Sequence, residues 1–158
     1  MYDQLLPLIL FGIATAFTPG PNNILSSYSG FNFGFKKTIP LMLGVILGWT
    51  TMLTVMASGL IIIFQKYIFL QSIIKILGTI FLIYLAYKIA FSSTNESENI
   101  KKPVLFFDTF LFQFINPKGV MVAMIAVSTF IDIQNNYLRD ATIVIITYFF
   151  MAVFSVSS

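Results

Sequence analysis

The sequence predicts an all-α membrane protein. Hydrophobic residues make up 58% of the 158-residue chain and charged residues 9%, and the mean hydropathy is +0.90. These values lie outside the range of soluble domains. The apolar residues fall into five runs, each long enough to cross a hydrocarbon core of about 30 Å as an α-helix. Proline and glycine interrupt the first and the fourth of these runs.

The composition also excludes several kinds of function. The chain has no cysteine and no histidine, which removes thiol–disulfide chemistry, haem ligation by His or Cys, and the usual zinc sites. We therefore expect no cofactor and no metal. The net charge of +3 is small and its basic residues are scattered, so nucleic-acid binding has no support. Since no pair of acidic residues lies deep in a span, we also expect that the protein is not an enzyme.

The first span, residues 5–28, contains the break around which we expect the protein to be organised. Residues 19–21 read Pro-Gly-Pro, which removes backbone donors and permits a bend, so the helix cannot continue. Unpaired backbone groups are costly in hydrocarbon unless protein, water or a ligand satisfies them. The break is therefore either a packing kink or a binding site. Asn22 and Asn23, at the start of the restarted helix, favour a binding site.

The second and third spans are expected at residues 39–64 and 69–91, after a loop at residues 30–37. No charged residue occurs within 39–64, as a membrane span requires. The second span carries Gly44 and Gly48 on one helix face.

Glycines on one face let a neighbouring helix approach closely. We expect Gly44, Gly48 and, in the third span, Gly78 to serve in helix packing.

A hydrophilic segment, residues 92–103, divides the chain into two parts. Residues 1–91 are the first half, with three helices. Residues 104–158 are an incomplete second half with two helices, predicted at 104–130 and 141–158. The segment between the halves is expected to be a flexible linker.

The fourth span is broken by Asn116, Pro117 and Lys118. A lysine near the centre of a bilayer costs about 2.5 to 3.5 kcal/mol on insertion scales, so it should face a wet cavity or a partner. The alternative is that its long stem carries the ammonium group out to the membrane surface.

The two breaks lie at matching depths in oppositely directed helices. Pro19 follows Leu5 by 14 residues, and Pro117 follows Val104 by 13. Paired interruptions in two inverted halves point to a transporter binding site. We therefore expect an inverted 3+3 repeat with its first and fourth helices broken.

The basic residues predict that the amino terminus lies outside. With that orientation five basic residues are cytoplasmic and three are outside, with Lys118 left out of the count because it lies within a span. The cytoplasmic five are Lys36, Lys37, Lys88, Lys101 and Lys102. The linker at 92–103 is then cytoplasmic.

The sequence resembles the lysine exporter and homoserine/threonine exporter (LysE/RhtB) family of bacterial inner-membrane amino-acid exporters. The resemblance is carried by FTPGPN at 17–22, FGFKK at 33–37, Gly44 and Gly48, Gly78 with YLAYK at 84–88, and FLFQFINPK at 110–118. It implies six spans in two inverted halves, a multi-pass protein of the inner membrane, and efflux of amino acids in exchange for protons.

The chain also departs from this pattern. Ala86 and Tyr87 stand where the family usually has Gly-Trp, Thr109 where Gly is frequent, and Gln113 where Asn is frequent. Five spans are present of the expected six. Either the chain is a fragment, or another subunit supplies the missing helix, or the product does not transport.

The predicted binding site lies between the first and the fourth span. Its residues are Thr18, Pro19, Gly20, Pro21, Asn22, Asn23, Asn116, Pro117 and Lys118. The restarted helix after Pro21 would offer amides and a positive end to a substrate carboxylate. Lys118 would supply a cation for the same carboxylate or a proton relay, and carbonyls near Phe17 and Thr18 would receive the substrate ammonium.

The sequence therefore predicts an exporter of a small amino acid, with the lipid bilayer and the amino acid as its partners. The alternative is a truncated or non-transporting membrane subunit of the same family. Proton coupling lacks an obvious acid, because Asp108 lies near the cytoplasmic end of its span. The sequence leaves open which amino acid is carried, whether protons couple, and whether the chain forms a homo-oligomer.

Overall fold

The computed structural model describes residues 2–90, 104–132 and 134–157, and within them all regular structure is helical. This confirms the all-α prediction. The predicted linker at 92–103 lies outside the described residues.

The first predicted span is two helices, α1 (Tyr2–Phe17) and α2 (Pro21–Phe33). Their axes differ by 52° across the break. Pro21 occupies the first turn of α2, where its missing N–H costs no helical hydrogen bond and its fixed φ suits the helix. Pro19 disfavours a helical conformation at Thr18, where α1 has ended, and Pro21 starts α2.

The prediction of a loop at residues 30–37 is wrong. Helix α2 continues to Phe33, and α3 (Phe35–Val55) begins after a single residue. That residue is Gly34, whose φ of 79° is accessible mainly to glycine. The turn is closed by a buried hydrogen bond of 2.9 Å between the hydroxyls of Ser29 and Thr38. One glycine was sufficient where a longer polar loop was expected.

Beyond α3 the chain passes through one π-helical turn, Met56–Leu60, into α4 (Ile61–Lys66). Gly59 has a φ of 124° and makes the kink there. The Tyr137 hydroxyl donates to the Ala57 carbonyl at 2.7 Å. A π turn disturbs the regular helical pairing of carbonyls, and this side chain compensates for it.

The third and fourth predicted spans are confirmed as helices. They are α5 (Ile68–Ala90) and the broken pair of α6 (Phe106–Ile115) and α7 (Pro117–Phe130). The axes of the pair differ by 61°. The last helix, α8 (Tyr137–Ser157), begins earlier than the predicted residue 141.

The turn between α7 and α8 is organised by Asp132. Its carboxylate accepts the side-chain amide of Asn135 at 3.1 Å and the backbone N–H of Gln134 at 2.9 Å. These hydrogen bonds lower the pKa of Asp132. Asp140 is buried in the first turn of α8 and pairs with Arg139 at 3.0 Å. Local polar contacts thus allow the helix to start earlier than its apolar residues suggest.

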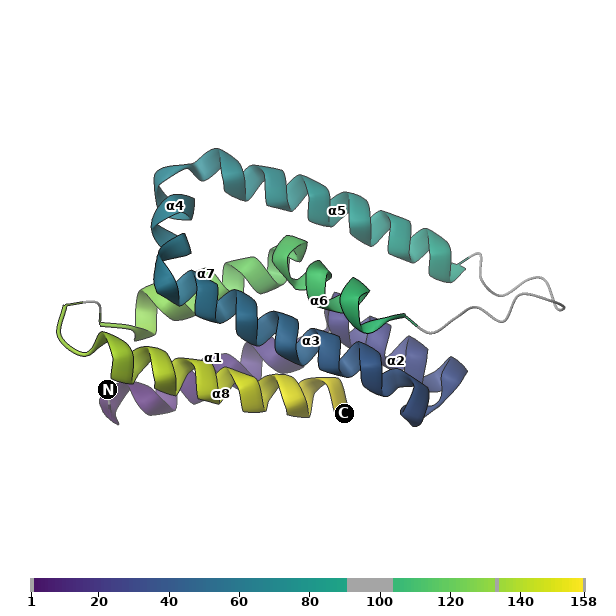
Figure 1. Cartoon of the computed structure of the whole chain (residues 1–158), viewed down its shortest axis with the longest axis horizontal. Helices are drawn as coiled ribbons and strands as arrows, with labels where there is room; N and C mark the ends of the chain where they lie inside the picture. Colours follow the sequence, from purple (N-terminus) through teal and green to yellow (C-terminus); the bar gives the residue numbers. More distant parts are fainter. Residues whose placement is uncertain (1, 91–103, 133, 158) are drawn as a thin grey trace, which may run out of the picture.

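Several helices meet the length and hydropathy that a membrane span needs. The stretch from α3 into α4 and helix α8 meet them alone, and each bent pair meets them as one broken span. Helix α5 adds 23 largely apolar residues. The protein is therefore a multi-pass membrane protein. The Gly34 turn, the end of α5 and the start of α6 lie at one end of the molecule (Figure 1).

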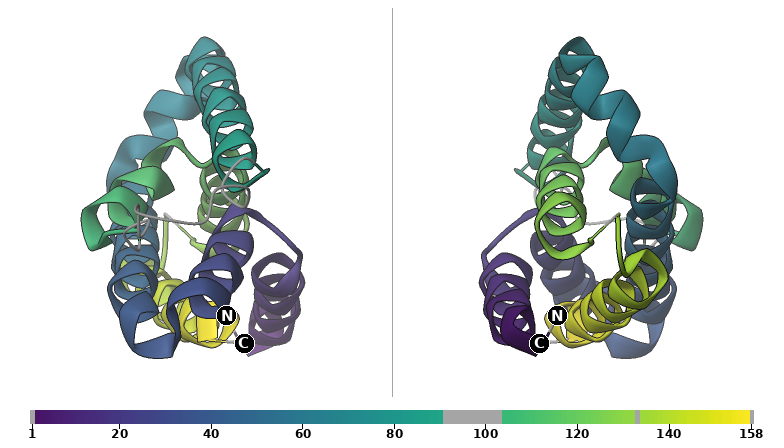
Figure 2. Two further views of the ribbon diagram at one scale, coloured as in Figure 1. Left: turned by 90° about the vertical axis from the view of Figure 1, so that its right-hand side faces the viewer. Right: turned by 90° about the vertical axis from the view of Figure 1, so that its left-hand side faces the viewer.

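Helix α3 packs closely on α6 (Figures 1 and 2). A Cβ at Gly48 would lie 2.6 Å from the Phe110 carbonyl oxygen, so only glycine permits this approach. Gly44 lies against Thr109, whose hydroxyl donates to the Leu41 carbonyl at 3.0 Å. The close contact fixes α6, and with it the second break.

Gly78 of α5 has the same kind of contact with the second break itself. It lies against the Pro117 ring, and a Cβ there would be 2.8 Å from the Ile115 carbonyl oxygen. The glycines singled out in the sequence thus lie where helices meet.

Candidate functional site

The two breaks are in direct contact. The Lys118 ammonium donates a hydrogen bond of 2.5 Å to the carbonyl oxygen of Thr18. Its Nζ would lie only 3.0 Å from a Cβ at Gly20. The lysine side chain therefore crosses from the start of α7 to the Pro-Gly-Pro segment, and Gly20 leaves it the room to do so.

The start of α2 has no side-chain cap. Its N-cap residue is Gly20, which has no side chain to accept a hydrogen bond from the first turn. A helix start carries unpaired N–H groups and about half a positive charge. Together with the Lys118 ammonium, this makes a strongly positive point at the first break.

The start of α7 is capped differently. The Asn116 side-chain oxygen accepts the backbone N–H of Gly119 at 3.4 Å, and Asn116 is 2% exposed. Asn116 is thus a buried capping residue.

An amide pair joins the two broken spans. Asn22 donates to the Gln113 side-chain oxygen at 2.8 Å, and Gln113 donates back to the Asn22 oxygen at 3.1 Å. Gln113 is fully buried and also donates to the Thr109 carbonyl at 2.8 Å. The pair fixes the position of Asn22 beside the positive point.

Helix α8 completes the first break from the other side. The Ser155 hydroxyl donates to the Ala16 carbonyl at 2.6 Å and lies 3.2 Å from the Asn23 side-chain oxygen. Asn23 also donates to the Ala16 carbonyl, at 3.3 Å. Three helices therefore share one polar cluster.

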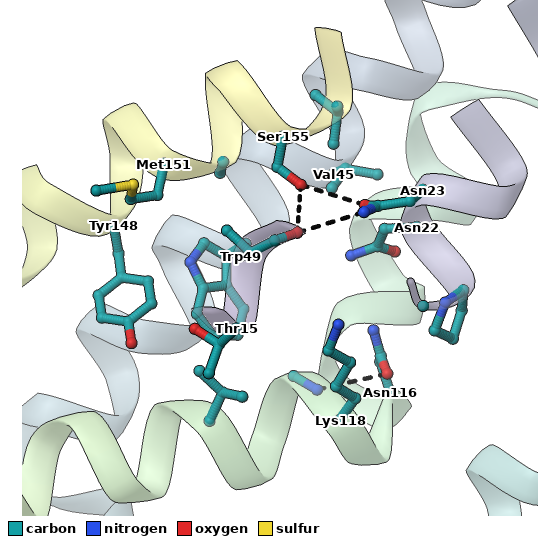
Figure 3. Close-up of a pocket in the computed structure, with 17 residues that line it drawn as sticks. Thr15, Asn22, Asn23, Val45, Trp49, Asn116, Lys118, Tyr148, Met151 and Ser155 are labelled. Atoms are coloured by element: carbon teal, nitrogen blue, oxygen red, sulfur yellow. Dashed lines mark hydrogen bonds between the residues drawn. The ribbon is translucent and has the colours of Figure 1, made fainter. Parts of the chain in front are cut away.

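These groups surround a cavity (Figure 3). Six of the predicted binding residues line it: Gly20, Pro21, Asn22, Asn23, Asn116 and Lys118. Thr18, Pro19 and Pro117 do not line it, although Thr18 contributes its carbonyl to Lys118. That carbonyl was expected to receive a substrate ammonium, and instead it holds the lysine.

Sequence reasoning missed the rest of the cavity wall. The missed residues come from α1, α3, α7 and α8, and they include Thr15, Trp49, Val122, Tyr148, Met151 and Ser155. The residues from α8 recur at helical spacing, which places them on one face. A tyrosine and a serine on one face of an apolar helix are a signal that could have identified this wall.

The cavity has a polar end and an apolar end. The side chains of Asn22, Asn23, Asn116 and Lys118 gather at one end, and the aromatic rings of Trp49 and Tyr148 lie toward the other (Figure 3).

Lys118 is the one charged residue among the described residues that line the cavity. The site therefore suits a ligand that presents an anionic group to one end and an uncharged group to the other.

The chain is similar to known proteins. Among similar proteins are the cysteine/O-acetylserine efflux proteins of Escherichia coli and Shigella sonnei, 33% identical to this chain over 124 residues. The match covers 77% of this chain and 62% of each relative. The chain thus spans less than two thirds of the length of these curated relatives. No solved structure matches it.

The family comparison covers nearly the whole chain. The family model described as LysE type translocator matches residues 13–157, which include both breaks and every residue found to line the cavity. The chain belongs to the LysE type translocator family.

Proposed function

We propose that this protein takes part in exporting a small, neutral amino acid across the bacterial inner membrane. The observation that carries the proposal is the convergence of the Lys118 ammonium and the uncapped start of α2 at Gly20. Membership of a translocator family supports a transport function. The names of its relatives support amino acids as the substrates.

The substrate carboxylate would bind between Lys118 and the first turn of α2. Without a ligand the ammonium donates to a neutral carbonyl, that of Thr18. A carboxylate adds the attraction between two opposite charges, which a neutral carbonyl does not provide. A carboxylate would therefore draw Lys118 away from Thr18 and take the helix amides as additional donors.

The substrate ammonium would bind to the side-chain oxygens of Asn22 and Asn23. Each oxygen has two lone pairs and can accept two hydrogen bonds. The Asn22 oxygen accepts from Gln113, and the Asn23 oxygen lies within hydrogen-bond distance of the Ser155 hydroxyl. The carbonyl of Thr18 would also become available once Lys118 turns to the carboxylate. Binding would thus exchange a contact between the two breaks for contacts to the ligand.

Proton exchange is the coupling reaction that we propose. No carboxylate is among the described residues of the cavity wall, so Lys118 is the cavity group best suited to carry the proton. It would do so while also binding the substrate carboxylate, which couples the two events.

The chain contains a natural reporter for this site. Trp49 is its single tryptophan, and it lines the cavity. Its fluorescence, excited where tyrosine does not absorb, should change when an amino acid binds to the purified chain in detergent. Cysteine and O-acetylserine are the first ligands to test.

Lys118→Met should weaken this binding roughly tenfold or more, because a hydrogen bond to a charged group contributes about 1.5 to 3 kcal/mol. The matched control is Lys75→Met, which removes an exposed lysine of α5 that is not among the residues of the cavity wall. Efflux of the loaded amino acid from cells that express each variant gives the second measurement.

Equal affinities in the wild type and Lys118→Met would contradict the carboxylate site. If no amino acid changes Trp49 fluorescence or leaves the cells, the proposed function itself is wrong.

A further inference from the structure

The apolar end of the cavity contains a buried polar group that the proposed function does not use. The Tyr148 side chain is 2% exposed, and its hydroxyl makes no hydrogen bond of acceptable geometry. A buried hydroxyl without a partner costs about 1 to 3 kcal/mol relative to a satisfied one. Such a group in a cavity wall is therefore a candidate for contact with a ligand.

Thr15 is a second polar side chain in this part of the cavity wall. Figure 3 shows the two hydroxyls close together at this end of the cavity. Thr15 gives its own proton to the Phe11 carbonyl at 2.8 Å, so its oxygen is left as an acceptor. The Tyr148 hydroxyl donates to neither Thr15 nor any other described residue, so its proton is available to a ligand. The two residues thus offer one donor and one acceptor to a ligand.

The surroundings of these hydroxyls exclude a charged ligand group. The Trp49 ring lies 5.7 Å from the Tyr148 ring, and Met151 and Val122 complete the wall. Lys118 lies toward the polar end in Figure 3. A charged substrate side chain placed here would lose its hydration without gaining an ion pair, which is strongly unfavourable.

We infer that Tyr148 and Thr15 form a side-chain subsite for neutral amino acids that carry a hydroxyl or carbonyl oxygen. The inference rests on the proposed function, which places the substrate carboxylate at Lys118. The substrate side chain then extends past Trp49 toward α8. The Tyr148 hydroxyl donates to its oxygen, and Thr15 accepts from a substrate hydroxyl where one is present.

A site built to hydrogen-bond a substrate oxygen rejects an analogue that lacks the oxygen, because its own polar group is then left unpaired. Tyr148 would therefore act as a residue that determines specificity. The preference should appear between ligands of equal size that differ only in this oxygen.

The test uses two such ligand pairs, serine with 2-aminobutyrate and homoserine with norvaline. Each is titrated into the purified full chain, with Trp49 fluorescence as the readout. The wild type should bind the oxygen-bearing member roughly tenfold more tightly, since about 1.4 kcal/mol corresponds to a factor of ten.

Tyr148→Phe removes the hydroxyl and keeps the ring beside Trp49. It should reduce the preference within each pair to near one and leave the affinity for 2-aminobutyrate and norvaline unchanged. Thr15→Val is the second variant, and it should reduce the preference for the hydroxyl ligands while the fold is kept.

A stability measurement separates this inference from a structural role. If Tyr148 serves only the fold, Tyr148→Phe will lower the melting temperature and weaken all four ligands equally. If the Tyr148 hydroxyl forms its hydrogen bond only with a ligand, the melting temperature of ligand-free Tyr148→Phe will equal that of the wild type or exceed it. An unchanged preference in Tyr148→Phe would overturn the subsite and leave the proposed function in place. A wild type that binds none of the four ligands, while Lys118→Met also has no effect on cysteine or O-acetylserine, would overturn both.

Discussion

The two broken spans bend by similar angles, 52° and 61°, yet they are held in very different ways. The break between α6 and α7 has its own cap in Asn116, and Gly78 of α5 packs on Pro117 beside it. The break between α1 and α2 starts its second helix from Gly20, which provides no cap, and Thr18 is exposed. The second break therefore has a side-chain cap for its restarted helix, and the first break has none.

The first break depends on other helices for its polar groups. Lys118 from α7 satisfies the Thr18 carbonyl, and Ser155 from α8 satisfies the Ala16 carbonyl. In hydrocarbon every such group needs a partner. A ligand that binds at the first break must therefore compete with contacts between helices.

This difference suggests that the two breaks have different roles in binding. The second break is a fixed base that carries Lys118, and the first break is the part whose contacts a substrate can replace. Ligand binding can shift a conformational equilibrium only through contacts that differ between the two states. The Lys118 to Thr18 hydrogen bond is such a contact.

The largest expected effect tests whether the second break is fixed by close packing. Gly48→Ala and Gly78→Ala should each destabilise the protein by about 1 to 3 kcal/mol, the usual cost of overpacking. The added methyl group would meet backbone, 2.6 Å from the Phe110 carbonyl oxygen or 2.8 Å from that of Ile115. Thermal unfolding in detergent measures the change.

Gly30→Ala is the matched control for both variants. Gly30 lies in α2 with nothing within 4 Å of a Cβ, so alanine should be neutral or slightly stabilising there. Equal stability of all three variants would show that the glycine contacts do not hold the second break.

A smaller effect is expected from the link between the breaks. Asn22→Leu and Gln113→Leu should each be destabilising, because each leaves the partner amide unpaired. Hydrogen bonds between membrane helices contribute about 0.6 kcal/mol on average and about 1.7 kcal/mol at most. We expect a coupling energy of about 1 kcal/mol, given that Gln113 is fully buried.

The double variant decides this prediction. The double variant should lose less stability than the two single losses added together, because neither amide is then left without a partner. Additive single effects would mean that the two side chains act independently, and that the breaks are coupled through Lys118 alone.

The sequence predicted the breaks because their causes are local. Proline removes a donor and clashes with the preceding turn wherever it occurs in a helix. Residues 19–21 and Pro117 therefore identified both bends before any contact was known. The same local reasoning failed for residues 30–37, since a single positive φ at Gly34 replaced the expected loop.

The cavity could be predicted only in part, because its wall depends on tertiary packing. The polar end was found from residues beside the breaks. Trp49 and Tyr148 lie away from the proline breaks, so reasoning from the breaks did not reach them, although Tyr148 shares one face of α8 with Ser155. Likewise the Thr18 carbonyl was expected to bind substrate, and only the three-dimensional path of the Lys118 side chain shows that it is already engaged.

The smallest expected change in stability comes from capping the first break. In Gly20→Ser the serine hydroxyl would accept a hydrogen bond from the first turn of α2, as Asn116 does for α7. The backbone at Gly20, with φ −159° and ψ 177°, accepts any residue. A serine N-cap is only a few tenths of a kcal/mol better than glycine, so the melting temperature should hardly change.

Amino-acid binding should nevertheless fall roughly tenfold, about 1.4 kcal/mol, because the new hydroxyl occupies an amide that the substrate carboxylate needs. Gly20→Ala adds the same Cβ, 3.0 Å from the flexible end of Lys118, without a capping group. It should retain more affinity than Gly20→Ser when both are followed by Trp49 fluorescence. Equal losses in the two variants would attribute the effect to crowding of Lys118, and the helix start would then have no part in binding the carboxylate.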